Sequence, residues 1–125
     1  MPASSHNTLQ IGDVHITGLT DGSITFDPRI LFPETPLQAW SPFHDRFPEY
    51  FEGQYFRNNL GSFVLTSNNQ RVVADSGYGP HGDMIGYPAP GELIKDFERN
   101  GIGLDTINTV FLTHLHGDHV GWNLR

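Results

Sequence analysis

The sequence contains no cysteine. This absence excludes a disulfide framework, a cysteine zinc site and a thiol nucleophile. A chain without disulfides is compatible with a reducing compartment, and we expect a cytoplasmic protein.

Long apolar runs and positive charge are also scarce. No stretch approaches the 18 consecutive apolar residues of a membrane-spanning helix, and residues 1–10 lack the basic and apolar regions of a secretory signal. Seven Lys and Arg face 14 Asp and Glu, which gives a net charge of −7. This acidic balance argues against nucleic acid or an anionic membrane as the main partner.

Turn-forming residues are abundant, with 14 Gly and 9 Pro among the 125 residues. Residues 1–7 are expected to form a disordered tail. Alternating apolar residues on both sides of Gly12-Asp13 predict a half-buried hairpin. Asp21-Gly22 predicts a second turn, followed by a third short strand over residues 24–26.

Residues 27–57 combine recurring prolines with many aromatic side chains. The prolines exclude a long helix or a central strand, so this stretch is predicted to be a loop region. Exposed aromatics are costly unless they cover something. Two interpretations stay open: a lid packed on the core of its own domain, or the wall of a substrate pocket or a contact between two copies in a homodimer.

The remaining elements indicate an α/β fold. Two apolar runs within residues 60–75 flank a polar turn at 67–70 and predict a β-hairpin. Residues 91–100 predict an amphipathic helix that ends at Gly101 in a left-handed conformation. A compact apolar run over 107–112 then predicts a buried strand, and a helix followed by a buried strand is typical of α/β layering.

That last strand leads into His114-Leu115-His116-Gly117-Asp118-His119. Histidines two apart on an extended backbone point to the same side, so His114 and His116 can bind one ion. Gly117 permits a sharp turn that brings Asp118 and His119 back toward the same point. Imidazole nitrogens and a carboxylate oxygen suit Zn²⁺, and also Fe, Mn or Co. The pattern therefore predicts half of a two-metal site.

The 114–119 segment resembles the His-x-His-x-Asp-His signature of the metallo-β-lactamase-fold hydrolases. Thr113 and residues 120–123 are similar to the branch that contains lactonase-like enzymes. Residues 72–77 resemble the strand-ending Asp-x-Gly of the family, and residues 19–22 resemble its early Asp-Gly turn. The resemblance implies an αββα sandwich.

The resemblance also implies roles for individual residues. His114 and His116 would bind a first metal, and Asp118 and His119 a second, with two Zn²⁺ in the complete family site. Asp118 would also be catalytic, orienting the metal-bound hydroxide that attacks a lactone or ester carbonyl of a small-molecule substrate. Asp75 would lie behind the ligands as a hydrogen-bond partner of a ligand histidine.

Family members are about twice as long as this chain, and their remaining ligands lie in the second half. We therefore expect residues 1–125 to be the N-terminal portion of a single metallo-β-lactamase-fold domain, inactive alone, with an exposed sheet face. The alternative is a truncated, catalytically inactive metal-binding or interaction module. Among enzymes, glyoxalase-II-like thioesterase and β-lactamase chemistry stay open.

Overall fold

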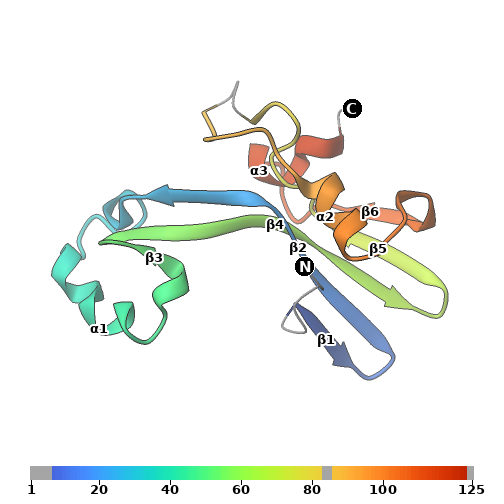
Figure 1. Ribbon diagram of the computed structural model, residues 1–125, viewed down its shortest axis with the longest axis horizontal. Helices are drawn as coiled ribbons and strands as arrows, with labels where there is room; N and C mark the ends of the chain where they lie inside the picture. The colour runs from blue at the N-terminus through green and yellow to red at the C-terminus, as the bar shows by residue number, and fades with distance from the viewer. Residues whose placement is uncertain (1–6, 83–85, 124–125) are drawn as a thin grey trace. The chain divides into compact units, whose positions relative to one another are not determined.

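The computed structural model describes residues 7–82 and 86–123 (Figure 1). Within these residues the strands are β1 (Thr8–Ile11), β2 (Val14–Phe26), β3 (Phe51–Glu52), β4 (Tyr55–Ser67), β5 (Gln70–Ala74) and β6 (Thr109–Phe111). The α-helices are α1 (Ser41–His44), α2 (Leu93–Arg99) and α3 (Gly117–Val120). The chain divides into unit 1 (Met1–Gly22 and Leu60–Arg125) and unit 2 (Ser23–Asn59), and strands β2 and β4 run from one unit into the other.

The sheet has the strand order β1-β2-β4-β5-β6, and β3 pairs with β4 beside this path. Strands β1 and β2 form an antiparallel hairpin in which Ile11 pairs with Val14. Strands β4 and β5 form a second hairpin, turned by Asn68 and Asn69 with φ angles of 48° and 62°. Two adjacent residues with positive φ are the signature of a type I′ hairpin turn. Both predicted hairpins exist, but the first is not half-buried as predicted, because every residue of β1 is exposed.

The predicted turn at Asp21-Gly22 is wrong, because β2 continues without interruption to Phe26. Thr17, Leu19 and Asp21 are all buried, so they lie on the same face of the strand at the period of two that a strand requires. Asp21 is therefore a core-facing strand residue. Residues 24–26 are the end of the same strand and do not form a third one.

Helix α2 packs on one face of the sheet and builds the core of unit 1. Its Leu93 and Phe97 pack with the strand residues Leu19, Val64 and Val73. The helix ends as predicted at Gly101, with a φ of 67°, and the Ile102 amide donates to the Phe97 carbonyl at 3.0 Å. This pattern is a Schellman-type cap.

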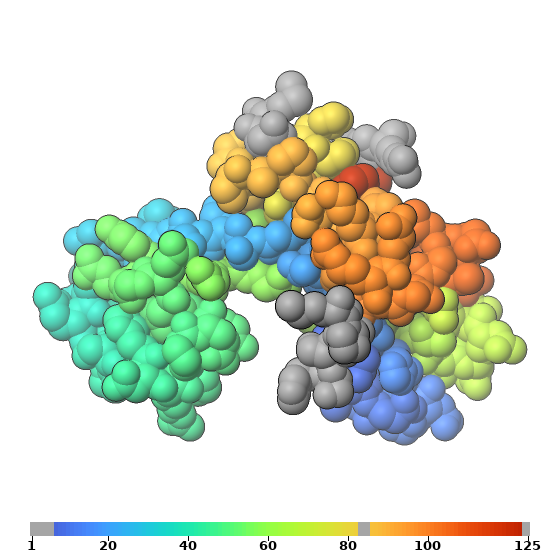
Figure 2. Space-filling view, in the orientation of Figure 1, coloured from blue at the N-terminus to red at the C-terminus, as the bar shows by residue number. Residues whose placement is uncertain are grey.

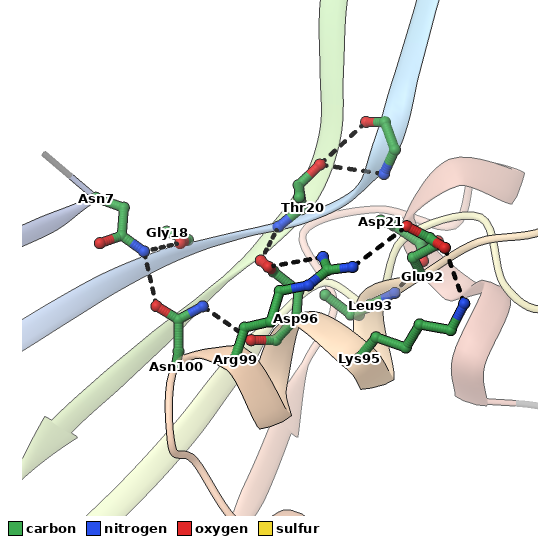
Figure 3. Close-up of polar contacts among 11 residues, drawn as sticks. Asn7, Gly18, Thr20, Asp21, Glu92, Leu93, Lys95, Asp96, Arg99 and Asn100 are labelled. Carbon is green, nitrogen blue, oxygen red and sulfur yellow. Dashed lines mark hydrogen bonds and ion pairs between the residues drawn. The ribbon is translucent and has the colours of Figure 1, made fainter. Parts of the chain in front are cut away.

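Polar contacts also hold α2 to strand β2 (Figure 3). The Thr20 amide donates to the Asp96 carboxylate at 2.8 Å, and the Asn7 side chain donates to Asn100 at 2.9 Å. Asn7 was expected within a disordered tail, but it is anchored here and on Gly18 at 3.1 Å, so that expectation is wrong for Asn7. Residues 1–6 of the expected tail lie outside the described residues.

The expectation of a buried last strand is also wrong. Strand β6 is parallel to β5, as α/β layering requires, but Val110 and Phe111 are 50% and 57% exposed. The reason is that β6 lies at the end of the strand order, paired with β5 alone among the described strands. Phe63, on β4, is 56% exposed as well, so apolar side chains of unit 1 face solvent.

Unit 2 is the proline-rich and aromatic region of the sequence, and Figure 2 shows its atoms, in cyan and green, gathered in one mass. Short 3-10 turns replace long elements: η1 (Pro28–Ile30), η2 (Leu37–Trp40) and η3 (Pro48–Tyr50). Phe56 packs against Trp40, Phe51 and Phe26, with ring centroids 4.8, 5.7 and 5.9 Å away. The aromatics thus form a cluster of ring contacts in which no ring is fully buried. Within the predicted loop region 27–57 the structure also has the short helix α1 and strand β3, and β4 begins there at Tyr55.

Among the described residues, we find no helix that combines the length and the apolar character needed to cross a membrane.

Candidate metal centre

The predicted ligands follow strand β6 in a tight loop and a single helical turn. His114 and His116 lie between β6 and α3, and Asp118 and His119 lie within α3. His116 has an extended backbone, with φ −68° and ψ 153°, immediately before the helix begins at Gly117. The predicted turn at Gly117 therefore exists, and it brings the ring of His119 within 3.9 Å of the ring of His114, measured between centroids.

Asp75 lies at the end of strand β5, directly behind this loop. Its φ of 64° places it in the left-handed region, which Asp tolerates better than most residues. The Thr113 amide donates to Oδ1 at 2.8 Å, and the Thr113 hydroxyl donates to Oδ2 at 2.7 Å. Burial raises the pKa of Asp75, but hydrogen bonds from Thr113 and His119 outweigh it, so the pKa lies below its ordinary value. Asp75 is therefore an acceptor for residues 113–122, which we call the metal loop.

His119 is oriented by this carboxylate. Its Nδ1 lies 2.7 Å from Asp75 Oδ2. Because a carboxylate oxygen accepts, Nδ1 is the donor in this contact, which leaves Nε2 as the nitrogen that could bind a metal. Nε2 points toward Asp118, with 3.4 Å between Nε2 and Asp118 Oδ2. A histidine held this way by a carboxylate is the usual arrangement of a metal-ligating histidine.

His114 is connected to the same carboxylate through Thr113. The Thr113 hydroxyl donates its proton to Asp75 and lies 3.1 Å from His114 Nδ1, so it accepts from that nitrogen. His114 Nε2 is hydrogen-bonded to His116 Nδ1 at 3.1 Å, a bond that a metal shared by the two nitrogens would replace. Asp75 thus sets the tautomer of one histidine in each predicted pair, directly for His119 and through Thr113 for His114.

The spacing within each pair can be compared with the needs of zinc. Two ligand atoms about 2.1 Å from a tetrahedral zinc lie about 3.4 Å apart. The pairs His114–His116 and Asp118–His119 have donor atoms 3.1 and 3.4 Å apart. No group of three or more His, Asp or Glu that could hold a metal ion occurs within the described ranges 7–82 and 86–123. Each pair could therefore supply two donor atoms to one metal ion, and the role of these residues as ligands stays a prediction.

The metal loop is fixed on the loop that follows β5 by backbone contacts. The Ser76 amide donates to the His119 carbonyl at 2.8 Å, and the Gly121 amide donates to the Gly77 carbonyl at 2.9 Å. A Cβ on Gly121 would overlap the backbone of Tyr78 and Gly79. Only glycine at 121 allows the two backbones to approach this closely.

Three contributors to this arrangement were missed by sequence reasoning. The resemblance includes Thr113 and Trp122 but assigns them no role, although the Thr113 hydroxyl donates to Asp75 and the Trp122 indole donates to Asp21 at 3.0 Å. Asp21-Gly22 has the composition of a turn, yet Asp21 lies in phase with Leu19 on the buried face of β2. That alternation was the available signal for Asp21.

Comparison with known proteins identifies the family. The family model described as the metallo-beta-lactamase superfamily matches residues 61–125, which is more than half of the chain. The chain belongs to the metallo-beta-lactamase superfamily, and the resemblance drawn from the sequence is confirmed.

Solved structures agree with this assignment. The hydrolase AbOPH of the beta lactamase superfamily is 26% identical, with a TM-score of 0.71, over 90% of this chain and 37% of that one. AidC, a dizinc quorum-quenching lactonase in complex with a product, is 21% identical, with a TM-score of 0.69, over 91% and 37% of the two chains. A probable metal-dependent hydrolase from Staphylococcus aureus is 21% identical, with a TM-score of 0.68, over 90% and 41%.

These matches confirm the predicted α/β fold of the metallo-β-lactamase type. The chain spans about two fifths of the length of each of these structures. None of the curated proteins matches the chain.

Proposed function

We propose that this chain provides half of the metal site of a metal-dependent hydrolase that acts on a lactone or a carboxylic ester. The observation that carries the proposal is the pair of donor sets, His114 with His116 and Asp118 with His119, both joined to Asp75. A two-metal site needs an acceptor that orients histidines of both sets, whereas a solvated surface loop does not.

Divalent cations, with zinc the first candidate, would polarise a substrate carbonyl, lower the pKa of water toward 7 and stabilise developing negative charge. The chain's own residues supply the positioning. Asp75 holds the protons on His119 Nδ1 and, through Thr113, on His114 Nδ1, so that both Nε2 atoms face the site. Asp118 is partly exposed, with 29% of its side chain accessible, and can therefore be reached by water or substrate.

The substrate class is supported by analogy with the fold relatives. One of them is a dizinc lactonase and another a hydrolase. The small-molecule partner fits the acidic composition, because a chain of net charge −7 repels polyanions.

The test uses the protein together with the sequence that follows Arg125 in its reading frame. We expect further His and Asp ligands there, and zinc-dependent hydrolysis of an acyl-homoserine lactone and of a p-nitrophenyl ester. Asp118→Ala should abolish both activities while the circular dichroism spectrum stays native. An active Asp118→Ala variant would remove Asp118 from catalysis, and a stop codon directly after Arg125 would contradict the enzyme proposal.

A second candidate is a metal-binding or interaction module without catalysis. It is favoured by the finding that the described side chains group in pairs, since a catalytic zinc normally has three protein ligands. Zinc binding without hydrolysis of any carbonyl substrate by the longest natural chain would select this alternative.

A further inference from the structure

The carboxylate of Asp21 is an unusual buried group that the proposed function does not use. Asp21 has no exposed surface. Its Oδ2 accepts from the amides of Tyr78 and Gly79 at 2.8 and 3.0 Å. Its Oδ1 accepts from the Leu93 amide at 2.7 Å and from the Trp122 indole at 3.0 Å. The carboxylate is therefore fully partnered, by groups from three separate segments.

The backbone around Asp21 is shaped to receive this carboxylate. A Cβ on Gly77 or on Gly91 would overlap the carboxylate oxygens of Asp21. Figure 3 shows Asp21 beside the first turn of α2, next to Glu92 and Leu93. Buried charge persists only where it is hydrogen-bonded, so this cradle makes an acceptor at position 21 a requirement of the fold.

Trp122 connects Asp21 to the metal loop. Its indole donates to Asp21, its amide donates to the Ser76 carbonyl at 3.2 Å, and it lies three residues after His119. The same carboxylate holds the Tyr78 and Gly79 amides, against which Gly121 packs. Asp21 thus fixes both sides of the contact between the 77–79 loop and the end of the metal loop.

The two donor pairs differ in their relation to Asp21. Asp118 and His119 are separated from Trp122 by at most four residues, within the consecutive turns α3 and η6 (Gly121–Asn123). His114 and His116 precede this turn; His114 is joined to Asp75 through Thr113, and His116 contacts His114. Disturbing Asp21 or its bond to Trp122 should therefore move the second pair more than the first.

We propose that Asp21 is a positioning residue for the second metal pair, acting through the Trp122 indole and the 77–79 loop. The proposal rests on the proposed function, because it assumes that Asp118 and His119 bind a metal. It assigns to Asp21 and Trp122 a role in metal affinity at one of two sites, beyond their part in the core.

The test is a Co²⁺ titration of the full natural chain, followed by visible absorption, in which the step that Asp118→Ala removes is assigned to the second pair and the step that His116→Ala removes to the first. Trp122→Phe keeps an aromatic ring in the core and removes only the indole donor. We expect it to raise the dissociation constant of the second pair about tenfold, the effect typical of residues that support a metal ligand. The dissociation constant of the first pair should change by less than about twofold. Trp40→Phe is the matched control, since the Trp40 indole has no hydrogen-bond partner among the described residues, and both constants should stay unchanged.

A second pair of variants tests the carboxylate itself. Asp21→Asn should weaken the second step at least as much as Trp122→Phe. Asp96→Asn, another buried carboxylate that accepts a backbone amide but has no bond to the metal loop, should alter neither step. If Asp21→Asn does not fold, Trp122→Phe decides alone.

The outcomes separate the two proposals. A wild-type chain that binds two Co²⁺ while Trp122→Phe leaves the second step unchanged, or weakens both steps equally, would overturn the role of Asp21 and leave the proposed function intact. A wild-type chain that binds no Co²⁺ would overturn both.

Discussion

At the scale of single residues, Asp75 joins the donor pairs by hydrogen bonds. The two carboxylate oxygens of Asp75 accept hydrogen bonds from the Thr113 amide, the Thr113 hydroxyl and His119 Nδ1. The structure joins Asp75 to His119 and Thr113 by hydrogen bonds, and its predicted place behind metal-ligating histidines stays a prediction. The relay through Thr113 could not be predicted, because it depends on a side-chain rotamer rather than on spacing.

Thr113→Val should test this relay. Valine has nearly the same shape but no hydroxyl, so His114 Nδ1 loses its acceptor and the tautomer of His114 is no longer fixed. We expect the first metal to bind about tenfold more weakly, measured by isothermal titration of Zn²⁺ into the full natural chain. Thr113→Ser retains the hydroxyl and should bind as the wild type does; a Thr113→Val variant with unchanged affinity would contradict the relay.

Gly121→Ala should test the close contact of the two loops. The new methyl group would overlap the backbone of Tyr78 and Gly79, which cannot move aside as a flexible side chain can. Overpacking of this kind costs about 3 kcal/mol of unfolding free energy, to be measured by urea denaturation. Gly117→Ala is the control: its methyl group meets no atom within 4 Å, so its unfolding midpoint should be nearly that of the wild type. Equal midpoints for the two variants would refute the contact.

At the scale of elements, the sequence predicted the features that depend on neighbouring residues, such as hairpin turns and helix ends. The hairpin at Asn68-Asn69 and the end of α2 at Gly101 both rest on left-handed residues, which the sequence displays directly. The continuity of β2 and the exposure of β6 depend on neighbours in the sheet. Asp21-Gly22 has the composition of a turn, and only its buried partners in unit 1 keep Asp21 within a strand.

Gly101→Ala should measure the helix cap by itself. At a φ of 67° an alanine is strained, and open space around the new methyl group means that no clash adds to the strain. The variant should lose about 1 kcal/mol of unfolding free energy in urea denaturation. A loss below about 0.3 kcal/mol, within the range of neutral surface substitutions, would show that the cap contributes little.

At the scale of the whole molecule, the exposed apolar side chains of unit 1 are the feature that bears on association between copies of the chain. Phe63 and Phe111 are more than half exposed, and the chain spans about two fifths of its structural relatives. The family resemblance predicted an exposed sheet face. Composition could not show it, because the same apolar content is compatible with a closed core.

The 125-residue chain by itself should therefore associate. Exposed aromatic side chains on an open sheet promote contact between copies. Phe63→Ser together with Phe111→Ser should raise the monomer fraction in analytical ultracentrifugation at equal concentration. Ile30→Ser, a control at a 70% exposed position in unit 2, tests whether any exposed apolar residue has the same effect. A wild-type chain that is already monomeric would contradict the expectation.

The central claim is that this chain supplies two donors to each of two metals. Equilibrium dialysis of the purified 125-residue chain against Zn²⁺, followed by desalting and metal analysis, tests it most directly. Two donors per ion hold zinc weakly, so the account predicts less than one Zn²⁺ retained per chain. Two tightly held Zn²⁺ per chain would contradict it, because such retention requires more ligands than the two pairs His114–His116 and Asp118–His119 provide.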